Sequence, residues 1–383
     1  MHTDDPQDLP CEVLHLNTER AMRGGEIQTL GLMRGLRSRG ALCTLVARDG
    51  GPLLARACEE GFGAIPWRPR GELDAVAAVR LRRWVRSSGA RVVHAHTAHA
   101  LGLALLALMG MRSRPLVVGS RRVSFPLRSA LSRWKYGRAD AVVAVSEEVR
   151  QGLLAQGLDE SRVWTIHSGV DLSRFGNMPS RAQARERFEI PADALVVGAV
   201  GALVEHKGHR VLLEALARLK GPSMDPWLVL AGEGELRDRL AREGHDRQVK
   251  VRFLGYVQEP AELYPALDVL ALPSLSGEGS PGVIKEAAAA GLPVVATDVS
   301  GTSEILRDGL EALLVPPGAP EPLAGALGRL LADPALAGRL SQAARLRIQA
   351  FGMDHMAQAH HDLYGRLLAA RAGSPGADPS KQG

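Results

Sequence analysis

The sequence predicts an α/β protein built of two doubly wound parallel-sheet domains that face a cleft. The chain of 383 residues is longer than one hydrophobic core usually serves. Short apolar runs alternate with spacers of helix length, which is typical of a parallel sheet. This series occurs twice, on either side of an irregular, charged stretch at residues 176–192. Ligands of such folds bind outside the carboxyl ends of the strands, so the strand-to-helix turns are where function is expected.

The apolar runs predict the strands and, through them, the domain boundaries. We expect an N-terminal domain over 1–175, a linker over 176–192, a C-terminal domain over 193–370 and a mobile tail over 371–383. The last helix of the C-terminal domain is a candidate to pack back on the N-terminal domain. The predicted strands are Val13–Leu16, Leu42–Val46, Val92–Val93, Leu116–Val118, Ala141–Val145, Val163–Ile166, Leu195–Val200, Trp227–Ala231, Val249–Phe253, Val269–Leu272, Pro293–Thr297 and Ala312–Val315.

Composition favours a soluble cytoplasmic protein. The hydrophobic fraction of 45% is ordinary, and no window holds the roughly 18 apolar residues of a spanning helix. The acidic start of the chain does not resemble a signal peptide, so export is not expected. The three cysteines Cys11, Cys43 and Cys58 cannot all pair, which fits a reducing compartment.

A basic stretch runs from Arg112 to Arg138 without an acidic residue. Phe125 and Trp134 are interleaved with its arginines. This pattern predicts a peripheral contact with an anionic membrane, or with a lipid-linked or phosphorylated acceptor. A solvated helix face explains the same pattern. Nucleic acid is not an expected partner, because no base-stacking pattern accompanies the charge.

Two strand-to-helix turns carry groups suited to phosphate. Gly24 and Gly25 precede a helical pattern, where backbone N–H groups can approach an anion closely; an ordinary tight turn has the same composition. The turn from Gly201 to Gly208 contains Lys207, whose ammonium can stabilise a diphosphate. A solvated surface lysine is the alternative interpretation.

The segment from Glu278 to Glu286 is the most informative. Ser280 is suited to an N-cap and Pro281 to the first helical position. Glu278 then precedes the helix and can bind sugar hydroxyls, while Glu286 lies in its second turn and can accept from ribose hydroxyls. Free N–H groups between the two carboxylates can receive phosphate. A cap interaction and a solvated face would explain both glutamates without a ligand.

Three histidines, His94, His96 and His99, follow one another at the end of a strand. No carboxylate or cysteine accompanies them, so we expect no metal there and favour a polar, cleft-lining role for His96 or His99. An Asp-x-Asp pair, the usual handle for a metal-bound nucleotide, is absent from the sequence.

These motifs together resemble retaining glycosyltransferases of family 4, which have the GT-B fold of two Rossmann-like domains. The resemblance covers nearly the whole chain and is densest from Val200 to Leu314. The matching elements are Gly24–Glu26, Gly169–Asp171, Lys207–Gly208, Ala231–Gly234, Phe253–Val257, Leu272–Ser274, Glu278–Glu286, and Gly301 with Glu304.

The resemblance implies a role for each matching position. Gly25 would lie against the donor phosphates, Lys207 would contact the diphosphate, and the backbone at Val257 would hold the base. Glu278 would bind the transferred sugar and Glu286 the ribose. The substrate-binding candidates are therefore Gly24, Gly25, Gly201, Lys207, Val257, Glu278, Gly279, Ser280, Pro281, Gly282, Val283 and Glu286.

The chain also departs from the family pattern. Ala202 stands where the family commonly has an arginine that partners the lysine, and Gly119–Arg122 replaces a frequent histidine motif. Arg121 or Arg122 is a candidate for the lost cation, and either could instead face an anionic acceptor. An additional Gly277 precedes the acidic motif, and Ser168 stands where asparagine is frequent.

The expected function is a retaining, metal-independent transfer from a UDP- or GDP-sugar to a glycan, glycolipid or phosphorylated acceptor, without a cofactor. The catalytic candidates are Lys207, Glu278, His96, Arg121 and Arg122. The expected setting is cell-envelope glycan, glycolipid or polysaccharide synthesis at the inner face of the cell membrane. A sugar-nucleotide epimerase of the same architecture and a catalytically silent sugar-nucleotide-binding protein are the alternatives.

Overall fold

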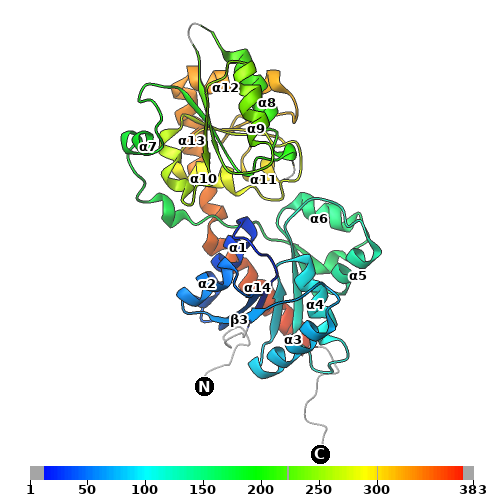
Figure 1. The fold of residues 1–383 in the computed structure, drawn as a ribbon. Coiled ribbons are helices and arrows are strands. Elements are labelled where there is room, and N and C mark those ends of the chain that lie inside the picture. The colour runs from blue at the N-terminus through cyan, green and yellow to red at the C-terminus, as the bar shows by residue number, and fades with distance from the viewer. Residues whose placement is uncertain (1–12, 222–223, 300, 374–383) are drawn as a thin grey trace, which may run out of the picture. The chain divides into compact units, whose positions relative to one another are not determined.

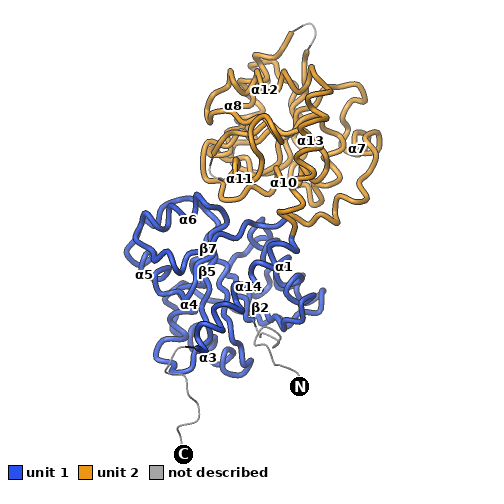
Figure 2. Tube along the Cα trace, turned by 180° about the vertical axis from the view of Figure 1, so that it is seen from behind, with its two compact units in different colours: residues 1–169, 353–383 blue, residues 170–352 orange. Residues whose placement is uncertain are grey.

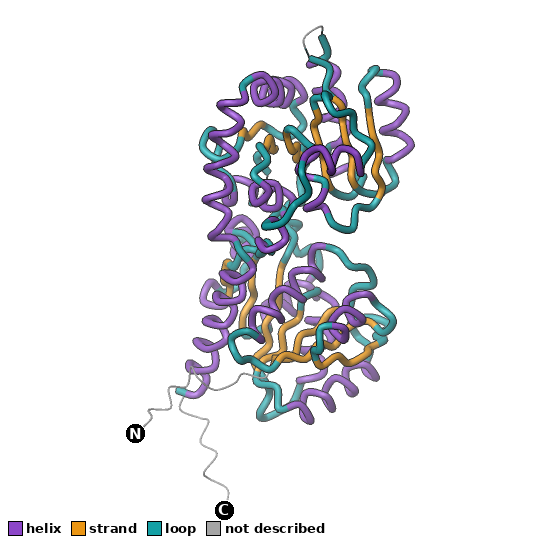
Figure 3. The backbone as a smooth tube through the Cα atoms, turned by 90° about the vertical axis from the view of Figure 1, so that its left-hand side faces the viewer, coloured by secondary structure: helices purple, strands orange, loops and turns teal. Residues whose placement is uncertain are grey.

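The protein divides into two compact α/β units. This computed structural model describes residues 13–221, 224–299 and 301–373. Unit 1 comprises residues 1–169 and 353–383, and unit 2 comprises residues 170–352 (Figures 1 and 2). Each unit contains one parallel sheet with helices on both of its faces (Figure 3). The predicted fold class, two doubly wound parallel-sheet domains, is therefore confirmed.

Unit 1 contains a seven-stranded sheet in the order β3-β2-β1-β4-β5-β6-β7, in which all neighbours are parallel. Alternate residues of a strand enter different cores: Val13 belongs to the cluster on one face and Leu14 to the cluster on the other. Burial on both faces explains why these strands read as continuous apolar runs. The strands are β1 (Val13–Asn17), β2 (Cys43–Arg48), β3 (Gly63–Trp67), β4 (Val92–Ala95), β5 (Leu116–Arg121), β6 (Ala141–Ala144) and β7 (Val163–Thr165).

The strand β3 was not predicted from the sequence. It forms an edge of the sheet, begins at a glycine and contains Pro66, and only Trp67 among its residues is buried. Proline is tolerated at an edge because one side of the strand needs no ladder hydrogen bonds. The helices of unit 1 are α1 (Gly24–Arg37), α2 (Pro52–Glu59), α3 (Ala75–Ser88), α4 (Ala98–Leu108), α5 (Ala130–Arg138), α6 (Glu147–Leu154) and α14 (Met353–Ala372), with one 3-10 turn, η1 (Glu160–Arg162).

Unit 2 contains a six-stranded parallel sheet in the order β10-β9-β8-β11-β12-β13, and each of its strands coincides with a predicted run. The strands are β8 (Val196–Val200), β9 (Trp227–Ala231), β10 (Val251–Gly255), β11 (Val269–Leu272), β12 (Val294–Thr297) and β13 (Leu313–Val315). The helices are α7 (Arg181–Arg187), α8 (His209–Leu219), α9 (Arg237–Asp246), α10 (Gly282–Ala290), α11 (Thr302–Ile305), α12 (Pro320–Ala332) and α13 (Pro334–Arg347), and the 3-10 turns are η2 (Leu172–Phe175), η3 (Glu205–Lys207), η4 (Pro260–Glu262), η5 (Tyr264–Ala266) and η6 (Ile348–Phe351).

The boundary between the units differs from the predicted one. Unit 2 begins at Val170, and the segment predicted as a linker, 176–192, belongs to it. Within that segment α7 packs on η5, and Arg185 is buried with its guanidinium bonded to the carbonyl oxygen of Ala266 at 3.2 Å. The arginine-rich segment that suggested a linker thus contains a helix, α7, with a buried arginine. The first two residues of the predicted tail, 371 and 372, belong to α14. Residues 374–383 of that tail lie outside the described residues.

The last helix, α14, belongs to unit 1 and packs on α1. Two glycines of α1 allow the close approach. A Cβ atom at Gly31 would lie 2.5 Å from the Sδ atom of Met353, and one at Gly35 would lie 2.3 Å from the Cβ of Ala357. Any larger residue at either position would separate the helices.

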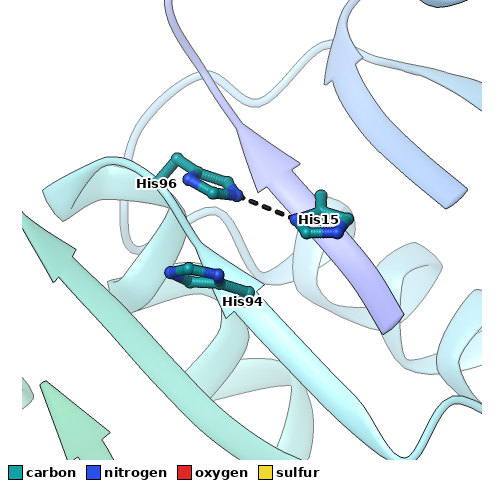
Figure 4. Close-up of side chains that lie close together, drawn as sticks. All are labelled: His15, His94 and His96. Carbon is teal, nitrogen blue, oxygen red and sulfur yellow. Dashed lines mark hydrogen bonds between the residues drawn. The ribbon is translucent and has the colours of Figure 1, made fainter. Parts of the chain in front are cut away.

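A buried polar network attaches α14 to the sheet of unit 1. The His94 ring contacts the Tyr364 hydroxyl through Nδ1 at 2.6 Å and the Ser120 hydroxyl through Nε2 at 2.8 Å. His15 Nδ1, in the middle of β1, lies 2.9 Å from Nε2 of His96, which directly follows β4 (Figure 4). The network therefore joins β1, β4, β5 and α14.

Among the helices of the described residues, none has both the length and the apolar composition needed to cross a membrane.

The buried histidines predict loss of stability in acid. Burial lowers the pKa of His15 to about 3 and that of His360 to about 4, and it holds the pKa of His94 and of His96 well below the usual value. The unfolded chain takes up protons near pH 6.5 while the folded protein does not. The free energy of unfolding should therefore keep its full value above pH 6.5 and fall by roughly 1 kcal/mol per histidine per pH unit as pH drops toward 4.

Urea unfolding between pH 7.5 and 4.5 measures this effect. Tryptophan fluorescence is a suitable probe, since the buried Trp67 lies in unit 1. His360→Gln should reduce the acid-dependent loss by removing one titrating ring. His355→Gln, at an exposed position of the same helix, should behave as the wild type. A midpoint independent of pH in the wild type would contradict the prediction.

Candidate functional site

Lys207 is positioned by the turn that follows β8. The turn contains η3 and ends at Gly208, whose φ of 69° is in the left-handed region. A Cβ atom at Gly208 would lie 1.9 Å from the carbonyl oxygen of Pro273, so the turn can pack on the loop after β11 only with glycine. The Leu275 N–H donates to the His206 carbonyl oxygen over 2.7 Å and fastens the two segments.

Lys207 and Glu278 form an ion pair. The Lys207 Nζ lies 2.6 Å from the Glu278 Oε1, and the Ser274 hydroxyl donates to the same oxygen over 2.5 Å. The Glu278 side chain is 8% exposed and that of Lys207 is 24% exposed. The structure therefore brings together two predicted site residues from turns that are 71 positions apart. Because the pair is partly open, an anion can approach the ammonium from solvent.

Gly201 has a role in the fold that accounts for its being glycine. Its φ is 148°, and its carbonyl oxygen would lie 1.9 Å from a Cβ atom at Gly232. Both glycines are thus required where the turn after β8 crosses the turn after β9. Contact between Gly201 and a ligand stays a prediction.

The start of α10 differs in detail from the predicted cap. The N-cap is Pro281, which supplies no side-chain hydrogen bond, and α10 begins at Gly282. Ser280 is not the cap, because its hydroxyl accepts a hydrogen bond from the Lys285 ammonium at 2.7 Å. The first N–H groups of the helix, at Gly282 and Val283, are therefore uncapped by a side chain. Together with the helix dipole they can receive an anion next to the buried Gly279 and Glu278.

Glu286 is held by two residues that sequence reasoning missed. The Tyr264 hydroxyl donates to Glu286 Oε2 over 2.7 Å, and the Arg174 Nη1 lies 3.9 Å from Oε1. Arg174 also pairs with Glu259 at 2.8 Å. Burial raises the pKa of Glu286 above its ordinary value. These partners lie far from Glu286 in sequence and match no local motif, so only the fold reveals them.

Val257 lies in a second part of unit 2. With Phe253, Tyr256 and Glu259 it lines a cavity of about 550 Å³ beside the end of β10. The Tyr256 side chain is 66% exposed. An exposed ring and a half-buried aliphatic wall are surfaces on which a planar base could rest. The predicted contact of a base with the backbone at Val257 stays a prediction.

In unit 1, Gly24 and Gly25 begin α1. Glu26, three residues after the N-cap Arg23, accepts from the Arg23 N–H at 3.1 Å and from the Asn17 amide at 3.1 Å. Neither glycine has a positive φ, and a Cβ atom at Gly24 would meet nothing within 4 Å. The fold does not require glycine here, which favours the predicted approach of a ligand to the backbone.

The structure separates the roles of Arg121 and Arg122. The Arg121 guanidinium donates to the carbonyl oxygen of Phe125 and lies over the Tyr136 ring. Arg122 extends along Gly25, and its Nη2 lies 3.2 Å from His96 Nδ1. Burial lowers the pKa of Arg122 to about 10, so it is charged near neutrality. Arg122 forms no ion pair with any described residue, and its Nε is buried without a partner.

His96 and His99 occupy different surroundings. The sequence predicted a cleft-lining role for His96 or His99, and the His96 side chain, 4% exposed, does not fill it. The residue directly follows β4, where its N–H donates to the Leu16 carbonyl oxygen and directs the ring inward. His99, in the first turn of α4, is exposed and lines a cavity. A catalytic role for His96 stays a prediction.

The histidine cluster is a candidate metal site by geometry. Its members are His15, His94 and His96, not His99, and one ring nitrogen of each lies within 4.8 Å of the others (Figure 4). Both nitrogens of His94 already have hydroxyl partners, and His96 lies against the cationic Arg122. A metal ion would have to displace these contacts beside a positive charge. The arrangement favours a hydrogen-bonded network, and the expected absence of a metal stays a prediction.

Comparison with known proteins finds glycosyltransferase family models that match both units. Residues 22–174 match a family model described as Glycosyltransferase Family 4, and residues 194–333 match one described as Glycosyl transferases group 1. The chain is 35% identical over 246 residues to a D-inositol 3-phosphate glycosyltransferase from Streptomyces bingchenggensis, covering 61% of this chain and 54% of that protein.

A second relative is the lipopolysaccharide core biosynthesis glycosyltransferase LpsE from Rhizobium meliloti, 39% identical over 160 residues, with 41% of this chain and 46% of that protein covered. The chain thus spans about half the length of these two curated relatives. Among solved structures, Anabaena HepE in complex with UDP-glucose superposes with a TM-score of 0.81 at 21% identity, covering 94% of this chain and 99% of that chain. The matched models extend over most of both units, and the chain therefore belongs to glycosyltransferase family 4 and has the GT-B fold.

Proposed function

We propose that this chain is a retaining, metal-independent glycosyltransferase that moves a hexosyl or related sugar from a UDP- or GDP-sugar to an acceptor hydroxyl. The observation that carries the proposal is the Lys207–Glu278 ion pair next to the uncapped start of α10. It combines an ammonium, a carboxylate and backbone N–H groups, which are the groups that a sugar diphosphate requires. The UDP-glucose complex of HepE supports this class of donor.

The reaction places one main electrostatic demand on the protein. The bond between the anomeric carbon and the diphosphate oxygen breaks, and the acceptor oxygen bonds to the same face of the sugar. The acceptor proton passes to the leaving phosphate, so no protein nucleophile is needed. Lys207 and the N–H groups of Gly282 and Val283 stabilise the charge that develops on the diphosphate. Glu278 binds hydroxyls of the transferred sugar, and Glu286 binds the ribose.

Arg122 is the residue we assign to the cation that Ala202 does not supply. It is charged, half-buried beside Gly25 and forms no ion pair with a described residue, whereas Arg121 donates to the Phe125 carbonyl oxygen of its own loop. The Glu26 carboxylate favours the charged form of Arg122 without contacting it, so a donor phosphate in direct contact would compensate the guanidinium charge further. His96 positions this guanidinium through Nδ1.

The setting of the reaction is proposed from the relatives. One is named for inositol 3-phosphate and another for lipopolysaccharide core synthesis. We therefore place the acceptor among cell-envelope glycans, glycolipids, polysaccharide precursors or phosphorylated compounds, at the cytoplasmic face of the membrane.

Two alternatives differ in what happens to the donor. An epimerase would isomerise the donor without an acceptor, and a silent protein would bind it without turnover, which Ala202 makes worth testing. Calorimetry with a panel of UDP- and GDP-sugars, followed by hydrolysis assays of the best binder, distinguishes them. We expect micromolar binding of one donor and slow release of the sugar with retained configuration. An isomerised donor, or binding without release, would contradict the proposal.

Lys207→Ala tests the diphosphate contact. Because the ammonium stabilises the leaving group, kcat should fall by roughly 10²–10³. Lys220→Ala removes an exposed lysine of the same unit and is the matched control. Thermal unfolding of both variants should be followed, since Glu278 loses its partner. Near-normal transfer by a folded Lys207→Ala protein would exclude the assignment.

Arg122→Gln in the same assay tests the second cation. It should weaken donor binding and turnover in the same direction as Lys207→Ala, whereas Arg121→Gln should change them little.

The basic stretch supports a peripheral contact with an anionic membrane. Phe125 and Trp134 are 46% and 45% exposed, and Arg128 and Arg133 are exposed beside them. Lys135 does not belong to this surface, because it is buried and paired with Glu72. Aromatic rings among arginines are the composition that inserts at the level of lipid headgroups.

Cosedimentation with vesicles of anionic lipid tests this surface. A variant with Arg128, Arg133 and Arg138 changed to Gln should bind several-fold more weakly at low salt, since each removed charge weakens the attraction. The control changes three exposed arginines of α9, Arg237, Arg239 and Arg242, to Gln and should bind as the wild type. Equal binding by the two variants would contradict the proposal.

A further inference from the structure

Two adjoining cavities open at the carboxyl ends of β1, β2 and β3 in unit 1. Their volumes are about 360 and 650 Å³, and Arg20, Arg48 and Arg70 line both. Arg20 follows β1, Arg48 ends β2 and Arg70 follows β3. In doubly wound sheets this edge is where ligands bind, and the volumes are those of small-molecule sites. We call these two cavities the arginine pocket.

The lining of the arginine pocket is strongly cationic. Besides the three shared arginines it contains Arg23 on the smaller cavity and Arg68 and Arg80 on the larger one. The carboxylates that line it are Glu19 and Asp74 alone. Six guanidinium groups thus face two carboxylates.

Only one of these six arginines, Arg68, forms an ion pair with a described carboxylate. Asp74 caps α3: it accepts from the Ala77 N–H at 3.0 Å and from the Arg70 N–H at 2.9 Å. Arg68 is paired with Asp49 at 2.6 Å. The side chains of Arg20, Arg23, Arg48, Arg70 and Arg80 form no ion pair with any described residue, although Arg48 Nη1 donates to the Pro69 carbonyl oxygen at 3.1 Å.

Unpaired arginines around one cavity repel one another unless an anion is bound. Guanidinium groups bind phosphate through two parallel N–H bonds. The lining therefore favours a ligand that carries phosphate over a neutral sugar. Other polar groups at the same cavity suit hydroxyls: the Thr18 hydroxyl contacts the Thr97 hydroxyl at 2.7 Å, and His99 is exposed. The combination matches a polyol or sugar that carries phosphate.

The arginine pocket is distinct from the groups assigned to the donor in unit 1. Neither Gly25 nor Arg122 lines either cavity. Arg23 is the N-cap of α1, so the pocket lies beside the turn of Gly24 and Gly25 without including it. A ligand in the pocket would therefore bind beside the turn assigned to the donor phosphates. It would not compete with the donor for Gly25 or Arg122.

We propose that the arginine pocket binds the phosphate group of the acceptor, so that the acceptor is a phosphorylated polyol, sugar or lipid headgroup. The inference rests on the proposed glycosyltransferase function and narrows its acceptor class. Arg20, Arg48 and Arg70 hold the phosphate, and Thr18 and His99 bind hydroxyls of the same molecule.

Calorimetry on the full chain tests the pocket with matched probes. Inositol 3-phosphate and unphosphorylated inositol differ only in the phosphate, and dihexanoylphosphatidic acid supplies a lipid phosphate. The test variant is R20Q/R70Q, which removes two exposed side chains that form no ion pair with a described residue. R83Q/R86Q removes two exposed arginines of α3 outside the pocket and is the control.

The wild type should bind at least one phosphorylated probe at least tenfold more tightly than inositol. R20Q/R70Q should lose at least tenfold in that affinity, and R83Q/R86Q should lose less than twofold. Preference for inositol 3-phosphate identifies a soluble acceptor, and preference for the lipid identifies a headgroup. Equal binding of inositol and both phosphorylated probes, or undiminished phosphate binding by R20Q/R70Q, would overturn the inference.

Donor calorimetry on the same proteins separates this inference from the proposed function. R20Q/R70Q should bind the nucleotide sugar as the wild type does. A wild type that binds a donor but neither phosphorylated probe would exclude the phosphate pocket alone. A wild type that binds no nucleotide sugar would exclude the proposed function, while its affinity for the phosphorylated probes would still report on the pocket.

Discussion

The contact between Lys207 and Glu278 determines which charged groups the turns of unit 2 can offer to a ligand. Glu278 is almost buried, and its charge is compensated by the ammonium and by the Ser274 hydroxyl. Removing one partner of such a pair leaves the other charge without compensation. Gly208 makes the pair possible, because only glycine lets the turn approach Pro273 closely enough. The ion pair therefore depends on the backbone conformation at Gly208 and on the packing of its turn against Pro273.

A donor entering this site would change the partners of that pair rather than meet isolated charges. Under the proposed function, the diphosphate would compete with Glu278 for the ammonium, and sugar hydroxyls would replace the ammonium at the carboxylate. Such an exchange would leave neither charge without a partner. Unit 1 differs, since Arg122 and five of the six arginines of the arginine pocket form no ion pair with a described carboxylate; Arg68, paired with Asp49, is the exception. In unit 2 a ligand would replace an existing ion-pair partner, whereas in unit 1 it would contact arginines that have no such partner.

The sequence predicted those features whose cause is local. Strands with an apolar run were found, including the half-buried edge strand β10, while the edge strand β3, which begins at a glycine and contains Pro66, was not. Lys207 and Glu278 were identified through their motifs. Tyr264 and Arg174 were missed because their contacts with Glu286 arise from the fold alone. The same limit applied to Lys135, whose partner Glu72 lies on a different segment.

The position of α14 has a consequence for synthesis on the ribosome. Unit 2 is one continuous segment, so all of its strands are made before α14. Unit 1 is interrupted: its sheet is made before unit 2, but the helix that covers Gly31 and Gly35 of α1 is made after unit 2. The apolar face of α1 and the ring of His94 therefore lack their partners while unit 2 is being made. That face stays without its partner until α14 has been made, and unit 2 can fold before unit 1 is complete.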